Sequence, residues 1–259
     1  MTDRRTVRLP FTWRIASRVE RPEAVLLALV LAGVAAAGWY GTGFWLAVAV
    51  ATQLVLGGLG AVWIIGPVTA GLGFARYATL AAAGVALTVF GRQAVGVIGI
   101  AMLPIAALLL WAVVWLELRT SKQGSGGLGL ELAMIGIVFA AAAGFARLAG
   151  ADGWPAGIGL TLAVTAVPAV RSAERRSRFG VEAVGQALLH LLAVAQVAAV
   201  VALLAIPPIV GAALLALTFH AWGGAAESLD EGASARSVAL EFGALAVLGV
   251  VVALLLSGA

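Results

Sequence analysis

Ionisable side chains inside an apolar sequence are the first candidates for chemistry, because charged groups are costly to place among hydrocarbon. Three glutamates, Glu131, Glu182 and Glu241, lie in the first turns of predicted apolar helices, and Glu117 and Arg76 are expected at the same level. These five residues could form a polar vestibule that binds a cation, a proton or a charged headgroup. Alternatively, each glutamate simply stabilises a helix N-terminus and pairs with an arginine. Glu241 is expected to lie deepest, and a carboxyl group there needs a partner or stays protonated.

The two histidines, His190 and His220, are candidates for binding a haem. They fall on adjacent antiparallel helices, which is the minimum arrangement for two axial imidazole ligands. At about 1.5 Å per residue, His190 is expected about 13 Å from the end of its helix, but His220 only about 6 Å. The two axial ligands of one haem must lie at similar depths in the membrane, so this difference argues against a shared haem. A histidine that is hydrogen-bonded to a neighbouring helix is therefore the favoured interpretation.

No other residue pattern predicts a cofactor, a metal site or a catalytic centre. The chain has no cysteine, which excludes a disulfide framework, thiolate metal ligands and a cysteine nucleophile. The glycine-rich stretch GLGFARYA, residues 71–78, lacks the preceding strand and the lysine of a phosphate-binding loop. The sequence therefore predicts no bound cofactor and no catalytic residues.

The elements that must position these residues are transmembrane helices. Hydrophobic residues make up 63% of the 259 positions and charged residues only 11%, and the mean hydropathy is +1.08. A globular domain carries about 25% charged residues, so this composition cannot cover a water-soluble surface. The sequence predicts an all-α polytopic transmembrane bundle whose partners are the lipid bilayer and other membrane-protein subunits. The excess of basic residues is interpreted as a signal for membrane orientation and not for nucleic-acid binding.

Nine apolar segments are candidate spans, given that a spanning helix needs about 20 residues. The third and the sixth are short, so eight spans are the alternative. Residues 1–23 form a basic tail, and residues 24–259 form one transmembrane domain because no connection is long enough for a soluble domain. The predicted spans are 24–40, 44–65, 77–90, 94–116, 128–146, 154–170, 181–205, 208–224 and 236–257.

Basic residues are distributed very unequally between the two sides of the predicted bundle. Of the 16 Lys and Arg residues, only Arg92 and Arg147 fall on the side away from the N-terminus. Cytoplasmic loops carry such an excess, so the N-terminus is predicted to lie inside, in a protein of the inner (plasma) membrane. The stretch AVRSAERRSRFG, residues 169–180, is interpreted as a cytoplasmic anchor after the sixth span, with lipid or partner docking as additional roles.

The chain also resembles a known superfamily in its layout. Nine spans with a basic loop after the sixth, together with ELAMIGIVFAAAAGFARLAG, VRSAERRSRFGVEAVGQALLH, IPPIVGAALLAL and SARSVALEFGALAVL, resemble the UbiA-type prenyltransferases and, more closely, the YwiC-like integral membrane proteins. The UbiA resemblance implies Asp-rich motifs for Mg²⁺ and diphosphate after the second and sixth helices. Those places read IIGPVTAGLGFARYA and AVRSAERRSRFG, without aspartate. Glu174 alone cannot bind Mg²⁺ and a diphosphate, so an active prenyltransferase is not expected.

Three functional hypotheses follow from these observations. The favoured one is a non-catalytic subunit or scaffold of a larger membrane complex, because buried polar groups are scarce. The second is a transporter or permease for a small or lipophilic solute, gated at the level of the glutamates, although no paired interrupted spans indicate an inverted repeat. The third is a degenerate UbiA-like prenyltransferase or a haem-bearing membrane anchor.

Overall fold

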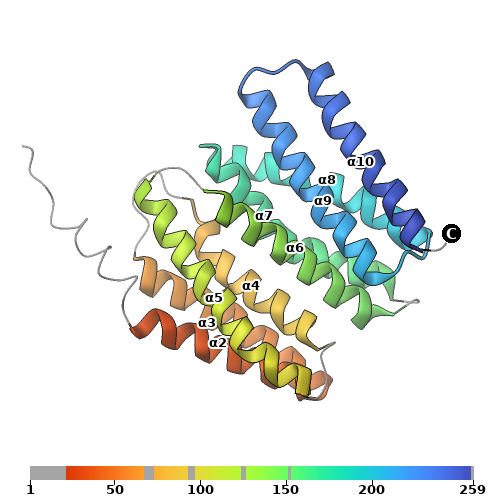
Figure 1. The fold of residues 1–259 in the computed structure, drawn as a ribbon. Helices are drawn as coiled ribbons and strands as arrows, with labels where there is room; N and C mark the ends of the chain where they lie inside the picture. The colour runs from red at the N-terminus through yellow and green to blue at the C-terminus, as the bar shows by residue number, and fades with distance from the viewer. Residues whose placement is uncertain (1–21, 67–72, 93–96, 124–126, 151–152, 258–259) are drawn as a thin grey trace, which may run out of the picture.

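The computed structural model describes residues 22–66, 73–92, 97–123, 127–150 and 153–257. Within these ranges the regular structure is a bundle of nine α-helices without a strand (Figure 1). Eight of the helices have the length and apolar composition of a transmembrane span, which confirms the predicted polytopic helical bundle. The helices are α2 (Pro22–Tyr40), α3 (Gly43–Ile65), α4 (Ala75–Gly91), α5 (Val97–Gln123), α6 (Leu128–Ala149), α7 (Trp154–Arg175), α8 (Val181–Leu203), α9 (Pro208–Asp230) and α10 (Ala235–Ser257).

Three helices continue at least five residues beyond their predicted ends. α5 ends at Gln123 instead of 116, α7 at Arg175 instead of 170, and α9 at Asp230 instead of 224. The predicted limits marked where the sequence stops being apolar. The headgroup layer adds about 5–7 Å on each side of the hydrocarbon, and helices continue through it with polar residues. Much of the stretch 169–180, which was predicted as a loop, is therefore part of α7.

The shortest helix, α4, lies at the centre of the bundle. It packs against α2, α3, α5, α6 and α7, and 14 of its 17 residues are buried. Small residues permit this close packing, as is common between membrane helices. A Cβ on Gly57 of α3 would lie 2.8 Å from the Cα of Ala81, and one on Gly144 of α6 would lie 2.7 Å from the carbonyl carbon of Val89.

Although α4 is short, it runs from one end of the bundle to the other. Its first residue, Ala75, donates a backbone hydrogen bond to Glu174 Oε1 in the last turn of α7 (3.0 Å). Just beyond its last residue, Arg92 Nη1 donates to the carbonyl oxygens of Gly38 and Gly41 at the end of α2 (3.2 Å each). The order of the helices places the ends of α7 and α2 on opposite sides. The third predicted span is thus present as a helix that traverses the bundle.

Buried apolar residues form two main clusters, one contributed by α2 to α6 and the other by α6 to α9. The first cluster contains a polar contact at Gln53, which is fully buried. Its Nε2 donates to the Leu31 carbonyl of α2 (2.7 Å) and to the Thr88 hydroxyl of α4 (3.3 Å). Because hydrocarbon offers no competing partner, such interhelical hydrogen bonds fix how neighbouring helices align.

Charged residues are concentrated at one end of the bundle, here called the polar end. This end contains the starts of α2, α4, α6, α8 and α10 and the ends of α3, α5, α7 and α9. Among the described residues, only Arg92 and Arg147 carry charge at the opposite end. The polar end is the one for which the sequence predicts a cytoplasmic position.

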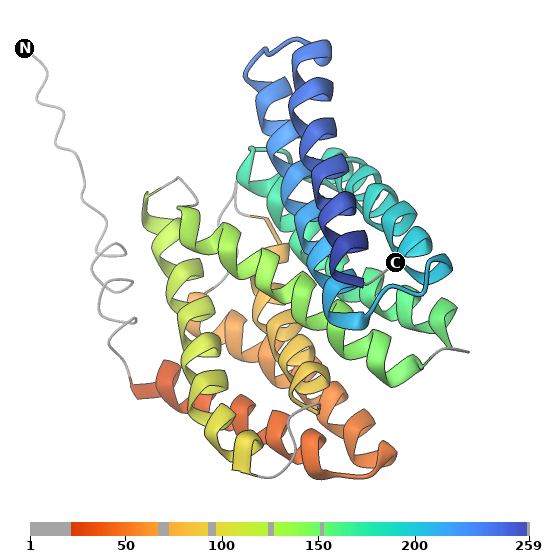
Figure 2. The same ribbon diagram turned by 45° about the vertical axis from the view of Figure 1, so that its right-hand side comes forward.

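The last helix, α10, lies at the edge of the bundle. It packs mainly against α9, and the α9–α10 hairpin extends past the other helices in both views (Figures 1 and 2). A groove of about 610 Å³ lies between α8, α9 and α10 and is lined mainly by apolar side chains. α10 therefore has a large surface that its own chain does not cover.

Candidate functional site

The last turns of α7 carry polar side chains on two different faces. Arg171 and Glu174 contact α5 and α4, whereas Ser172, Arg175 and Arg176 line a pocket against α6 and α9. Residues three positions apart share a helix face, so the Arg171 and Glu174 spacing is a usable signal once the helix is known to continue. The sequence prediction missed this arrangement because it placed these residues in a loop.

Arg171 and Glu117 form a buried ion pair between α7 and α5. Arg171 Nε donates to Glu117 Oε1 (3.0 Å), and Arg171 Nη2 donates to Glu117 Oε2 (2.7 Å). Glu117 is 1% exposed and Arg171 is 9% exposed. Removing one partner of such a pair leaves an uncompensated buried charge, which costs several kcal/mol. The predicted vestibule residue Glu117 is thus committed to a partner within the protein.

Glu174 places its carboxylate on the N-terminus of α4. Its Oε1 accepts the backbone N–H of Ala75 (3.0 Å), and its Oε2 lies 3.7 Å from Arg171 Nη1. A Cβ at Gly73 would lie 1.8 Å from the Glu174 carboxyl carbon, so only glycine leaves room for this approach. A helix N-terminus attracts anions through its free N–H groups and its dipole. The glycine-rich stretch therefore does accommodate an anion, and that anion is the protein's own side chain.

Arg76, in the first turn of α4, lies close enough to Glu117, Arg171 and Glu174 for its charge to interact with theirs. It is 2% exposed, and its guanidinium lies 5.6 Å from the centre of the Tyr77 ring. Its Nε has no hydrogen-bond acceptor among the described residues. Two arginines and two glutamates balance in charge, so the cluster of Arg76, Glu117, Arg171 and Glu174 joins α4, α5 and α7 without a net buried charge. The structure thus brings the predicted pair Arg76 and Glu117 together and adds two residues.

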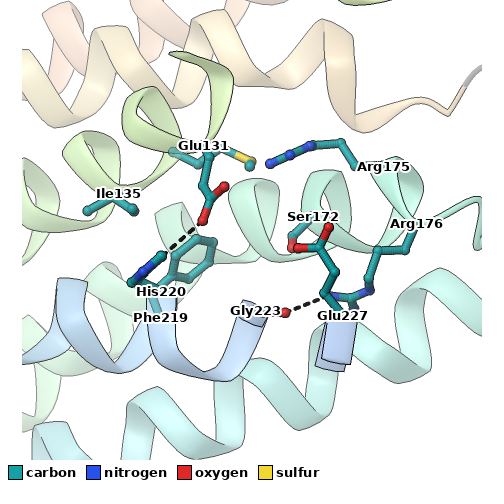
Figure 3. Close-up of a pocket in the computed structure, with 10 residues that line it drawn as sticks. Glu131, Ile135, Ser172, Arg175, Arg176, Phe219, His220, Gly223 and Glu227 are labelled. Carbon is teal, nitrogen blue, oxygen red and sulfur yellow. Dashed lines mark hydrogen bonds and ion pairs between the residues drawn. The ribbon is translucent and has the colours of Figure 1, made fainter. Parts of the chain in front are cut away.

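A second polar group lines a pocket of about 240 Å³ between α6, α7 and α9 (Figure 3). His220 Nδ1 lies 2.9 Å from Glu131 Oε1, so this pair joins α9 to α6. Arg176 Nη1 donates to the Gly223 carbonyl oxygen (3.5 Å), which joins α7 to α9. Figure 3 shows the Glu131–His220 pair on one side of the pocket and Arg176 with Glu227 on the other. The pocket therefore has one acidic side chain on each side, Glu131 beside His220 and Glu227 beside Arg176.

The three glutamates of the predicted vestibule have different surroundings. Glu131 lies in the pocket, whereas Glu182 pairs with Arg178 four residues earlier. Arg178 Nη2 also donates to Asp230 Oδ1 of α9 (3.0 Å). Glu241 is exposed on α10 and has no hydrogen-bond or ion-pair partner in the described part of the chain. Its sequence position predicted a deep carboxyl group, but α10 has too few neighbours to bury one.

The two histidines lie at similar depths, which corrects the prediction. His190 packs against Phe219, the residue directly before His220, so the two histidines lie at the same level of the bundle. The depth argument against a shared haem therefore fails. His190 Nε2 lies 2.9 Å from the Phe219 carbonyl oxygen, and the two rings stack with centroids 4.2 Å apart. His190 thus joins α8 to α9, while His220 joins α9 to α6.

The described side chains at the polar end make ion pairs and hydrogen bonds between helices. In the ranges that the structure describes, no group of three His, Asp or Glu side chains is placed to bind a metal ion. No family model, curated protein or solved structure matches the chain. The function is therefore argued from the pockets and from the side chains that line them.

Glutamine at Glu182 or Glu241 is expected to leave the abundance and the melting temperature of the protein nearly unchanged. Glu182 and Arg178 are both exposed, and exposed ion pairs contribute little to stability. Glu131→Gln removes one charged hydrogen-bond partner of His220 and is expected to lower the free energy of unfolding by about 0.5–1.5 kcal/mol. Thermal unfolding of the purified variants measures all three effects. A large loss at Glu241→Gln would show that α10 is buried against a further partner.

Proposed function

We propose that the protein is a transporter that moves a small solute along the interface between α6, α7 and α9. The observation that carries the proposal is a pair of pockets at the two ends of this interface. The polar-end pocket, of about 240 Å³, is lined by residues that include Glu131, Ser172 and His220. The opposite-end pocket, of about 480 Å³, is lined by residues that include Arg147 and Thr161.

The same face of α9 lines both pockets. Positions three or four residues apart share one helix face, and Leu215 and Phe219, which belong to different pockets, are four positions apart. The spacing continues in both directions along α9. The lining residues are Pro208, Gly211, Ala212 and Leu215 at the opposite end, and Phe219, His220, Gly223 and Glu227 at the polar end. The two pockets are thus aligned along one interface.

A layer of buried side chains separates the two pockets. Val138 of α6 and Thr165 of α7 are 0% exposed, and Phe219 of α9 is 3% exposed. Thr165 Oγ1 has no hydrogen-bond partner among the described residues, although buried hydroxyl groups nearly always have one. An apolar constriction of this kind excludes water until the helices separate. The arrangement supports an occluded state of a transport pathway.

The helix α7 is continuous but lacks one backbone hydrogen bond near the level of this layer. Pro168 lies inside the helix and leaves the carbonyl of Val164 without its usual helical hydrogen bond. Helices kink at such positions, and neighbouring groups in a membrane protein compensate for the missing bond. We therefore assign to α7 the movement that would open the layer toward either pocket.

A second candidate is a subunit or scaffold of a larger membrane complex, the hypothesis that the sequence favours. The observation in its favour is the edge position of α10, whose groove toward α8 is open. We do not extend the UbiA resemblance to prenyl transfer, because the one carboxylate of the stretch 169–180, that of Glu174, is bound to the start of α4. A transporter requires that water reaches Thr165 when the pathway opens, whereas a scaffold does not. Access of water to Thr165 therefore distinguishes the two candidates.

Single cysteines along α7 test the transport proposal, and the chain has no native cysteine to interfere. In sealed membranes, a membrane-impermeant maleimide is expected to label Ser172→Cys only from the polar end. It should label Thr161→Cys only from the other side. Thr165→Cys should react slowly, because the closed layer reaches water only when the helices separate. Labelling from the two sides also tests the predicted cytoplasmic position of the polar end in the plasma membrane.

Ala163→Cys is the matched control, because Ala163 lies on the same helix and is exposed on its outer surface. A cysteine in contact with lipid does not ionise and is expected to remain unlabelled. If Thr165→Cys is as unreactive as Ala163→Cys under all conditions, water never reaches the layer. That result would overturn the transport proposal in favour of the scaffold.

A further inference from the structure

We infer that the solute is a small carboxylate with an apolar body and that the opposite-end pocket is its binding site. The inference rests on the proposed transport function, but it is tested by binding alone. The pocket has a volume of about 480 Å³ and is formed by α6, α7, α9 and the end of α8. This volume lies within the range of about 300–1,000 Å³ that is typical of small-molecule sites.

Most of the pocket wall is apolar, so it complements an apolar body. Ile158, Ile206 and Leu215 line it with Trp154, and small residues such as Gly211 leave the space open. A ligand without apolar surface would gain nothing from this wall. Burial of apolar ligand surface contributes about 25 cal/mol for each Å².

Arg147 is the one charged residue among those that line this pocket. It lies in the last turn of α6 and has no hydrogen-bond or ion-pair partner among the described residues. A guanidinium binds a carboxylate with two parallel hydrogen bonds, which a lysine cannot do. Since a single guanidinium balances a single negative charge, the pocket fits a monocarboxylate.

Other ligand classes fit this lining less well. A cation would be repelled by Arg147, and a dicarboxylate would place its second charge against apolar walls without a partner. A sugar would leave several hydroxyl groups against the apolar wall without hydrogen bonds, which is unfavourable. Thr161 cannot serve many of them, because its hydroxyl already donates to the Gly157 carbonyl oxygen (2.8 Å).

The polar-end pocket is compatible with the same ligand. Arg175 and Arg176 line it from α7. Its acidic residues already lie beside cationic or proton-donating groups. Glu131 is bound to His220, and Glu227 lies next to Arg176 (Figure 3). An anion that crosses the buried layer thus meets arginine on both sides, and its apolar body lowers the cost of passing the layer itself.

Equilibrium binding of radiolabelled benzoate to the full chain in phosphatidylcholine nanodiscs tests the inference. Unlabelled phenylacetate is expected to displace benzoate, whereas benzylamine, benzyl alcohol and phthalate are expected to compete at least tenfold more weakly. Arg147→Gln is expected to weaken binding about tenfold or more, and Arg147→Lys by less. Because Arg147 is exposed, neither substitution should disturb folding.

Arg92→Gln is the matched control, because Arg92 carries the same charge at the same end but binds the carbonyls of Gly38 and Gly41 outside the pocket. Its affinity for benzoate is expected to equal that of the unmodified protein. The inference is overturned if benzoate does not bind, if benzylamine competes as well as phenylacetate, or if Arg147→Gln binds normally. If benzoate binds to the protein but the Thr165→Cys variant is never labelled, the carboxylate site is upheld and only the transport proposal is overturned.

Discussion

Glu117→Gln is expected to lower the free energy of unfolding by about 3–5 kcal/mol. The substitution keeps the size of the side chain and removes its charge, so the guanidinium of Arg171 loses its two-bond partner at 2.7–3.0 Å. The remaining carboxylate, that of Glu174, lies 3.7 Å away and is already bound to the start of α4. Equilibrium unfolding in mixed detergent micelles measures the loss.

A double variant distinguishes two effects on the free energy of unfolding, the cost of a buried charge without a partner and the net contribution of the ion pair. Glu117→Gln combined with Arg171→Met removes both charges and is expected to recover most of the lost stability, because a neutral buried pair needs no compensation. Glu182→Gln provides the surface control, since its ion pair is exposed. If Glu117→Gln is as mild as Glu182→Gln, then water enters the cluster and the ion pair is not buried.

Gly73→Ala is expected to reduce the amount of folded protein sharply, with a loss of stability of roughly 3 kcal/mol or more. The new methyl group would occupy the place of the Glu174 carboxylate, which lies 1.8 Å from the ideal Cβ position. Glu174 would have to leave the backbone N–H of Ala75, which would remain buried without a partner, and the displaced carboxylate would keep at most its contact with Arg171. Membrane abundance and thermal unfolding of the purified variant report the effect.

Gly33→Ala is the matched control for this prediction, because a Cβ at Gly33 meets no atom within 4 Å. Alanine at that helical position is expected to be neutral or slightly stabilising, since it reduces the entropy of the unfolded chain. Glu174→Gln tests the same contact from the other side and should be milder than Gly73→Ala. Equal behaviour of the two glycine variants would refute the role of Gly73 in admitting the carboxylate.

The fold class was predictable from the sequence, because apolar runs of about 20 residues leave few alternatives. The order of the segments and the concentration of arginine at one end followed from the same runs. The ends of α7 and α9 were not predictable in this way, since Arg171 and Asp230 are polar but belong to helices. A hydropathy profile identifies the residues that cross the hydrocarbon layer, but it does not identify the last residue of a helix.

The partners of the polar residues could not be predicted from the sequence, for a different reason. Glu117 and Arg171 are 54 positions apart, and Ala75 and Glu174 are 99 apart. A single sequence does not say which helices are neighbours, so it could not place α4 between α2, α3, α5, α6 and α7. The sequence could therefore offer the vestibule of glutamates only as a possibility, and it could not predict the cluster of Arg76, Glu117, Arg171 and Glu174.

The central position of α4 has a consequence for how the protein is made. With 17 residues, α4 is about 25 Å long, shorter than the hydrocarbon layer of about 30 Å, and its second residue is the buried Arg76. Without its neighbouring helices, α4 would therefore be unstable as a transmembrane helix in lipid. The side chains that stabilise its start, Glu117 and Glu174, are synthesised later, the second one 99 residues after Ala75. During translation, the backbone N–H of Ala75 cannot reach the carboxylate of Glu174 until α7 has been synthesised. The start of α4 therefore obtains this hydrogen bond from a helix in the second half of the chain.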